Sequence, residues 1–178
     1  DLFTGSTWVL TPTPCSDPAA FACLRDLVAA VGAEVIAVDP QRHDALVAIV
    51  SHVPHLAATT LMHVAAGAES DRATLLRLAA GGFRDMTRIA AGHPDIWPDI
   101  CVTNREAIVD VLDRYLAELR HVRDLVMGED REALLTMLSA AQTARRALPA
   151  AGVGPAREHV ELRIPVPDRP GVLADVPT

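Results

Sequence analysis

The hydrophobic pattern at the start of the chain is that of two short strands around one helix. Consecutive apolar residues fill much of 7–12 and 34–40, and each run ends at a proline. Between them, Phe21, Leu24 and Val28 recur at helical spacing, after a possible cap at Ser16 or Asp17. We predict a strand, a helix ending at Gly32 and a second strand, with the buried character of parallel strands at the edge of a doubly wound sheet.

From His43 to about Ala66 the pattern becomes helical. His52, His55, Thr59 and His63 fall beside the apolar face, at about 100° per residue. Pro54 lies inside this helix and predicts a kink or break, which would leave unpaired carbonyls near His52 and His55, as in the wall of a binding cleft. The residues expected on the apolar face are Leu46, Ile49, Val50, Val53, Ala57, Leu61 and Val64.

The rest of the pattern predicts three more helices. A short one spans 71–80, a long one follows a cap at Thr103 or Asn104 and ends at Gly128, and another spans 130–148. The last two form a helical hairpin. Leu134 and Leu135 widen the apolar stripe of the final helix and indicate a second partner surface, such as a dimer mate. Residues 149–158 are typical of a linker, and 161–176 of a strand, a turn and the start of a further element.

Residues 81–104 hold the most distinctive polar group. Gly81 and Gly82 interrupt a helical region and would let the backbone approach another group closely. Arg84 and Arg88 follow, with Trp97 nine residues after Arg88. A guanidinium fork matches a carboxylate, so one interpretation is an anion pocket with an apolar wall. The other is a loop in which the arginines pair with Asp85, Asp95 and Asp99.

Composition limits the possible partners. All sixteen basic residues are arginine and the net charge is −7, which argues against general binding of nucleic acid or an anionic membrane. No apolar run of about eighteen residues was recognised, so no membrane span is expected. The three cysteines form no C-x-x-C pair, which fits a reducing, cytoplasmic location. The sequence begins with Asp1 and ends inside what resembles a new element, so we expect a longer protein.

The histidines allow two interpretations. His43, His52 and His55 could share a metal ion, but no carboxylate or cysteine completes a set and H-E-x-x-H is absent. We therefore expect no metal and assign these histidines to the polar lining of a ligand cleft. No motif of a hydrolase is present, and no glycine-rich phosphate loop follows either strand.

An ordered set of motifs runs through the chain. The motifs are Thr7-Trp-Val-Leu-Thr-Pro12, His43-Asp44, Ser51-His-Val-Pro-His55, Gly81-Gly-Phe-Arg-Asp-Met-Thr-Arg-Ile-Ala90, Trp97-x-Asp99-Ile100 and Asn104. Together they resemble the prephenate dehydrogenase family, over about residues 2–148. The tail from Leu162 through Asp168-Arg-Pro-Gly-Val-Leu-Ala174 is similar to the start of an ACT regulatory domain.

The resemblance implies a mainly α chain in three parts. Residues 1–40 would be the C-terminal β-α-β end of an α/β Rossmann domain, and 41–150 an all-helical domain for substrate binding and dimerisation. Residues 151–178 would be a linker and the beginning of the ACT-like domain. The family's glycine-rich loop and its catalytic histidine and serine would lie before Asp1. This chain alone is then expected to be inactive, and NAD or NADP to be bound mainly outside it.

The resemblance also implies the reaction and the site. The complete protein would oxidatively decarboxylate prephenate to 4-hydroxyphenylpyruvate in tyrosine biosynthesis, with tyrosine as a possible effector. Arg88 would bind a substrate carboxylate, and Arg84 would be structural. Asp85 would orient Arg88 or His55. Other residues implied near the substrate are His55, Trp97, Gly81 and His52, with His43 and Asp44 toward the cofactor.

Three alternatives remain open from the sequence. Arogenate dehydrogenase shares the same motifs. Another dehydrogenase with a Rossmann domain and a helical domain would share the architecture. A helical dimerisation module without enzymatic activity is the non-catalytic alternative.

Overall fold

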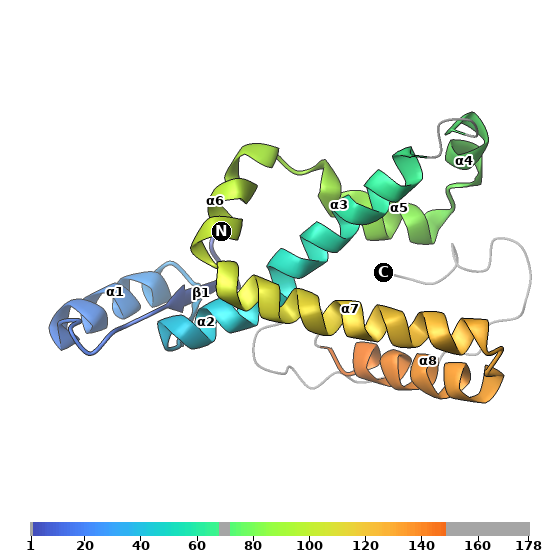
Figure 1. The fold of residues 1–178 in the computed structure, drawn as a ribbon. Coiled ribbons are helices and arrows are strands. Elements are labelled where there is room, and N and C mark those ends of the chain that lie inside the picture. The colour runs from blue at the N-terminus through green and yellow to red at the C-terminus, as the bar shows by residue number, and fades with distance from the viewer. Residues whose placement is uncertain (1, 68–71, 149–178) are drawn as a thin grey trace, which may run out of the picture.

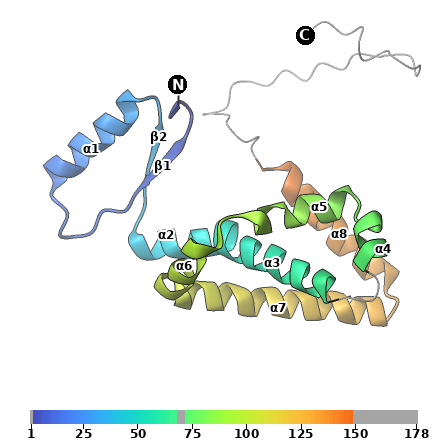
Figure 2. The same cartoon turned by 90° about the horizontal axis from the view of Figure 1, so that it is seen from above.

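The computed structural model describes residues 2–67 and 72–148, and the predicted linker and ACT-like segment lie outside these ranges. The described chain consists of a small β-α-β unit and a larger group of helices, which lie side by side in the view of Figure 2. The predicted class, a mainly α domain after a β-α-β remnant of a Rossmann domain, is confirmed.

The β-α-β unit comprises β1 (Thr7–Leu10), α1 (Pro18–Ala30) and β2 (Glu34–Ala37). The strands pair in parallel, with Thr7 opposite Glu34. Asp17 caps α1 by accepting hydrogen bonds from the N–H groups of Ala19 and Ala20. Gly32 follows the helix at φ +81°, a conformation that favours glycine.

The prediction that both strands are buried is wrong for this chain. The side chains of Trp8, Val9 and Ile36 are exposed. A parallel sheet buries both faces only when helices cover both, and here α1 is the one helix packed on it among the described residues.

The central helical stretch runs from Pro40 to Ala66 in three parts: α2 (Pro40–Val47), a π-helical turn (Ala48–His52) and α3 (Val53–Ala66). In the π turn the Val53 N–H donates to the carbonyl of Ala48. The helix then restarts at Val53, which places Pro54 in a first turn where its missing N–H costs little. The break that Pro54 predicts is therefore a π turn just before it, with no interruption of the helix.

The predicted apolar face of this stretch is largely wrong. Val50 is 73% exposed, and Leu46, Ile49 and Val64 are also exposed. The π turn adds a residue to one turn, so the residues on its two sides do not follow a single helical repeat. Ala48 is instead fully buried, and it forms the core with Val53 and Ile108.

The remaining helices follow this stretch in the chain (Figure 1). They are α4 (Arg72–Leu78), α5 (Gly81–Thr87), α6 (Trp97–Thr103), α7 (Arg105–Met127) and α8 (Arg131–Arg146), with 3₁₀ turns at Arg88–Ala91 and Pro94–Ile96. The first part of α7 packs on the π turn, and α8 runs back along α7 as the predicted hairpin.

The stretch Pro40–Ala66 corrects the expectation that no apolar segment is long enough to span a membrane. It contains an 18-residue window with a mean hydropathy of 1.5, so its length and composition would suffice to cross a membrane. The central helix of a helical bundle meets the same criterion. This stretch packs against α5, α7 and the Arg88–Ala91 turn.

Candidate functional site

The centre of the candidate site is a stacked pair of rings, His55 and Trp97. Their centroids lie 3.5 Å apart and their planes differ by 10°. His55 stands in the first turn of α3 and is 9% exposed, while Trp97 is the first residue of α6. The stack therefore joins two segments that both belong to the predicted site.

His52 is the third ring of this cluster. It ends the π turn, and its ring meets the Trp97 ring edge to face at 6.4 Å and 87°. Residues three apart on a helix lie on one side of it. The structure thus brings His52, His55 and Trp97 together, as predicted.

Asn104 connects His52 to the helix before it. Its Nδ2 donates to the backbone carbonyl of Asp44 at 2.8 Å and lies 3.2 Å from Nδ1 of His52. On α2, His43 Nδ1 and Asp44 Oδ1 lie 2.9 Å apart. His43 and Asp44, predicted toward the cofactor, are therefore continuous with the histidine cluster.

The role of Asn104 was missed from the sequence. Asn104 occupies the N-cap position of α7, as predicted, but its side chain makes no capping hydrogen bond. The side chain is 8% exposed and reaches α2 and the π turn. The partners lie 60 and 52 residues away in sequence, a range that helical periodicity does not address.

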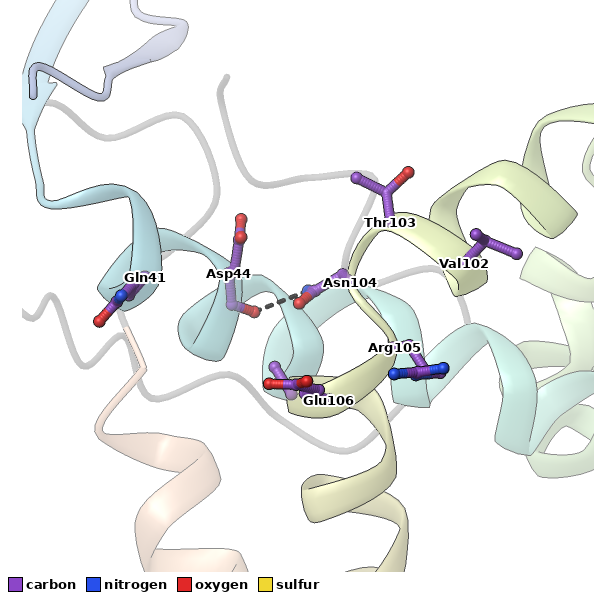
Figure 3. A pocket seen from close by; sticks show the side chains of 8 residues that line it. Gln41, Asp44, Val102, Thr103, Asn104, Arg105 and Glu106 are labelled. Carbon is purple, nitrogen blue, oxygen red and sulfur yellow. Dashed lines mark hydrogen bonds between the residues drawn. The ribbon is translucent and has the colours of Figure 1, made fainter.

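Two cavities adjoin this network and share Asp44, Thr103 and Asn104. Figure 3 shows the larger, of about 580 Å³, between α2 and the junction of α6 with α7. Both volumes fall within the range of small-molecule sites. The smaller, of about 440 Å³, is lined by His43, Asp44, Val47, Ser51, His52, Asp99, Ile100, Thr103 and Asn104.

Burial disfavours the charged form of the clustered histidines. It lowers the pKa of His55, and it lowers the pKa of His52 against the opposing effect of Asp44, with His43 adding a smaller decrease. Neutral imidazoles offer hydrogen bonds and ring surface without positive charge. A cation for an anionic ligand must come from another residue.

The segment that carries Arg88 packs against α3. A Cβ added at Gly92, at the end of this segment, would lie 3.6 Å from Cε1 of His55. The Arg88 side chain is exposed, and it has no ion pair or hydrogen bond within the described residues. The alternative in which the arginines pair with Asp85, Asp95 and Asp99 is thus not seen there.

Arg84 has a structural contact, as predicted. Its Nε donates to the carbonyl of Ala79 at 3.1 Å and so ties the start of α5 to the residues before it.

Two contacts expected of this segment are not found among the described residues. A Cβ at Gly81 would meet nothing within 4 Å, so the approach of this glycine to a ligand stays a prediction. Asp85 is exposed and forms no hydrogen bond with Arg88 or His55 within the described chain. No hydrogen bond or ion pair joins Asp85 or Arg88 to the ring cluster in that part of the chain.

A family model described as prephenate dehydrogenase, dimerization domain, matches residues 39–140. The chain belongs to the prephenate dehydrogenase family. This match contains the three rings, both cavities and Arg88.

Individual relatives agree with the family. The chain is 34% identical over 175 residues to a prephenate dehydrogenase of Bacillus subtilis (strain 168), covering 98% of this chain and 47% of that protein. A solved prephenate dehydrogenase of A. aeolicus, in complex with hydroxyphenyl propionate and NAD⁺, superposes with a TM-score of 0.76 at 30% identity, over 82% of this chain and 51% of that one.

A Synechocystis arogenate dehydrogenase superposes with a TM-score of 0.74 at 29% identity, covering 82% of this chain and 53% of that one. The chain therefore spans about half the length of the relatives that it matches.

The described residues do not form a dinucleotide phosphate site. Thr11-Pro12 follows β1 and Val38-Asp39-Pro40 follows β2, where a phosphate-binding turn would need glycines. The family's cofactor therefore does not find its phosphate contacts in this part of the molecule.

Proposed function

We propose that the complete protein is a prephenate dehydrogenase and that this chain supplies the substrate side of its active site. The observation that carries the proposal is the His52–His55–Trp97 cluster, whose central ring, His55, stands on the helix α3 against which the Arg88 segment packs. Membership of the family and the hydroxyphenyl ligand of the A. aeolicus enzyme support the same substrate class.

The chemistry of prephenate fits these residues. Prephenate is a dianion whose ring carries a carboxylate and a hydroxyl group. The Arg88 guanidinium can bind one carboxylate with two parallel hydrogen bonds. The His55–Trp97 stack offers a flat apolar surface to a ring that becomes planar during the reaction. The neutral histidines can hydrogen-bond oxygen atoms without fixing a carboxylate so strongly that its loss as carbon dioxide is opposed.

The cofactor and the proton-transfer groups belong to the proposal for the complete protein. NAD or NADP would accept the hydride from the hydroxyl-bearing carbon, held by residues outside those described. The histidine and serine that act on the hydroxyl are likewise assigned to residues outside those described. This chain contributes binding and orientation, which can account for a large part of a rate enhancement.

The test is oxidation of prephenate by the complete protein. We expect reduction of NAD⁺ or NADP⁺, followed by absorbance, with formation of 4-hydroxyphenylpyruvate. Absence of a hydroxyphenyl product with both cofactors would reject the proposal. Cofactor preference follows from the same assay.

Arogenate dehydrogenase is the second candidate, favoured by the similarity to the Synechocystis enzyme. Arogenate differs from prephenate in bearing an amino group on the side chain, and Arg88 could bind a carboxylate of either. Competition between the two acids for the complete protein would separate the candidates by the ratio of their kcat/KM values.

We further propose a cytoplasmic homodimer. The family's dimerization domain and the exposed leucines of α8 support the dimer. Regulation by tyrosine rests only on the ACT-like sequence and would be rejected if tyrosine leaves the activity of the complete enzyme unchanged.

A further inference from the structure

Asn104 uses both hydrogens of its amide nitrogen. One hydrogen bond goes to the backbone carbonyl of Asp44, 2.8 Å away, as drawn in Figure 3. A backbone carbonyl only accepts, so the nitrogen of the amide and not its oxygen must face Asp44. The same nitrogen lies 3.2 Å from Nδ1 of His52.

We infer that Asn104 is a positioning residue that holds His52 as the neutral tautomer with its hydrogen on Nε2. The amide nitrogen is a donor only, so Nδ1 of His52 must accept. A hydrogen on Nδ1 would place two N–H groups against each other, and the contact would be lost. Because Asn104 is itself fixed by α2, the ring of His52 is fixed in both orientation and tautomer.

The surroundings of His52 agree with a neutral ring. Asp44 and His43 on α2 and Asp99 on α6 line the same cavity, and Trp97 lies edge to face with the ring. Burial lowers the pKa of His52 more than the Asp44 carboxylate raises it. The geometry of the Asn104 amide then selects between the two neutral forms.

The consequence is a defined hydrogen-bond donor, Nε2, on a residue that lines the cavity. Nε2 of His52 has no hydrogen-bond partner among the described residues. Every side-chain nitrogen or oxygen that is buried away from solvent in that part of the chain does have a partner. Nε2 is therefore accessible, and His52 lines the cavity of about 440 Å³. Any hydrogen bond from His52 to a ligand oxygen is donated by Nε2. That this oxygen belongs to prephenate or arogenate rests on the proposed function.

Nuclear magnetic resonance of ¹⁵N-histidine-labelled chain tests the inference, with His52 assigned through His52→Gln. In the wild-type chain we expect a single Nε2–H tautomer without averaging. Asn104→Asp places an acceptor beside Nδ1, so the hydrogen should move to Nδ1 and the pKa of His52 should rise. Gln142→Glu, the same amide-to-carboxylate change on exposed α8, should alter neither.

Two results would overturn it. The first is a His52 ring that, in the wild-type chain, averages between tautomers or carries its hydrogen on Nδ1. This result would reject the inference even if Asn104→Asp does not fold. The other is an unchanged tautomer and pKa in folded Asn104→Asp.

Kinetics of the complete protein test the substrate role separately. There Asn104→Asp should raise KM and shift its pH profile more than it changes kcat, whereas Gln142→Glu should not. A wild-type protein that oxidises neither acid rejects the proposed function and leaves the tautomer result standing. Suppose instead that the wild type is active and that Asn104→Asp changes the tautomer but leaves the pH profile of KM unchanged. That result would reject a role of His52 in substrate binding.

Discussion

At the scale of residues, the candidate site combines a cluster of aromatic rings with a separate charged side chain. His55 and Trp97 stack at 3.5 Å, and burial disfavours a charge on either histidine of the cluster. Under the proposed function, an anionic substrate takes its charge partner from Arg88. Arg84 is four residues away, but its side chain is bound to the backbone at Ala79.

Replacing Arg88 separates these two arginines. In the complete enzyme, Arg88→Ala removes a charge-assisted hydrogen bond, which contributes about 1.5–3 kcal/mol. At about 1.36 kcal/mol for each factor of ten, KM should rise by roughly 10- to 150-fold. Arg84→Ala loses the same charge and serves as the matched control, with a small expected change in KM. Equal effects of the two variants would contradict the assignment of Arg88, provided that circular dichroism shows both folded.

The neutral histidines predict how stability depends on pH. Since folding lowers the pKa of His52 and His55 below the ordinary value of 6.5, the unfolded chain binds more protons just below that pH. The contribution of these two histidines to the free energy of unfolding should be fully present above pH 6.5. It should be lost progressively as the pH decreases below that value.

Urea unfolding between pH 7.5 and 5.5 measures this effect. His55→Phe keeps an aromatic ring against Trp97 and cannot titrate, so its stability should fall less steeply over that interval. Identical pH slopes for His55→Phe and the wild-type chain would show that His55 does not contribute.

At the scale of elements, the π turn and the cap of α2 place the polar residues. The π turn carries His52 and lets the helix restart before Pro54. Asp39 begins α2 by accepting hydrogen bonds from the N–H groups of Gln41 and Arg42 at 2.9 and 3.2 Å, next to Pro40 in the first turn. The orientation of His43 and Asp44 follows from this start.

Removing the cap should loosen α2. Asp39→Ala leaves two backbone N–H groups without their side-chain partner and should lower the free energy of unfolding by about 1 kcal/mol. Asp39→Ser retains a capping oxygen and should lose much less. Chemical denaturation measures both, and equal losses would mean that the carboxylate acts through its charge and not as a cap.

At the scale of the whole molecule, the helical hairpin leaves apolar side chains uncovered. Leu135 and Leu138 on α8 are 63% and 65% exposed, and Leu116 and Leu119 on α7 are exposed as well. Figure 1 shows these two helices side by side. The predicted second partner surface of α8 therefore exists as an exposed face, and the proposed homodimer would cover it.

Charge on this face should separate the subunits. We expect the wild-type chain to sediment at about twice 19.0 kDa, and Leu135→Glu combined with Leu138→Glu to sediment as a monomer. Thr136→Glu adds charge at an exposed position on another side of the same helix and should leave the dimer intact. A monomeric wild-type chain, or a dimeric double variant, would exclude α8 as the interface.

The sequence by itself determined the longer elements and the common face of two of the three rings, but not α5, α6 or the π turn. Capping residues, glycines and apolar spacing act locally, so α1, α7, the hairpin and the parallel strand pair follow from short stretches of chain. His52 and His55 lie three apart on a helix, and that spacing alone puts them on one face. The family motifs implied that Trp97 lies near the same site, and in the structure its ring stacks on that of His55.

Tertiary structure decided burial and the long-range contacts. Val50 was expected inside and is exposed, because it lies in the π turn, where the extra residue breaks the regular helical repeat on which the expectation rested. Asn104 was expected only as a cap, yet its amide binds residues more than fifty positions away. Such contacts depend on how helices cross, and periodicity along one helix carries no information about the angle at which another helix meets it.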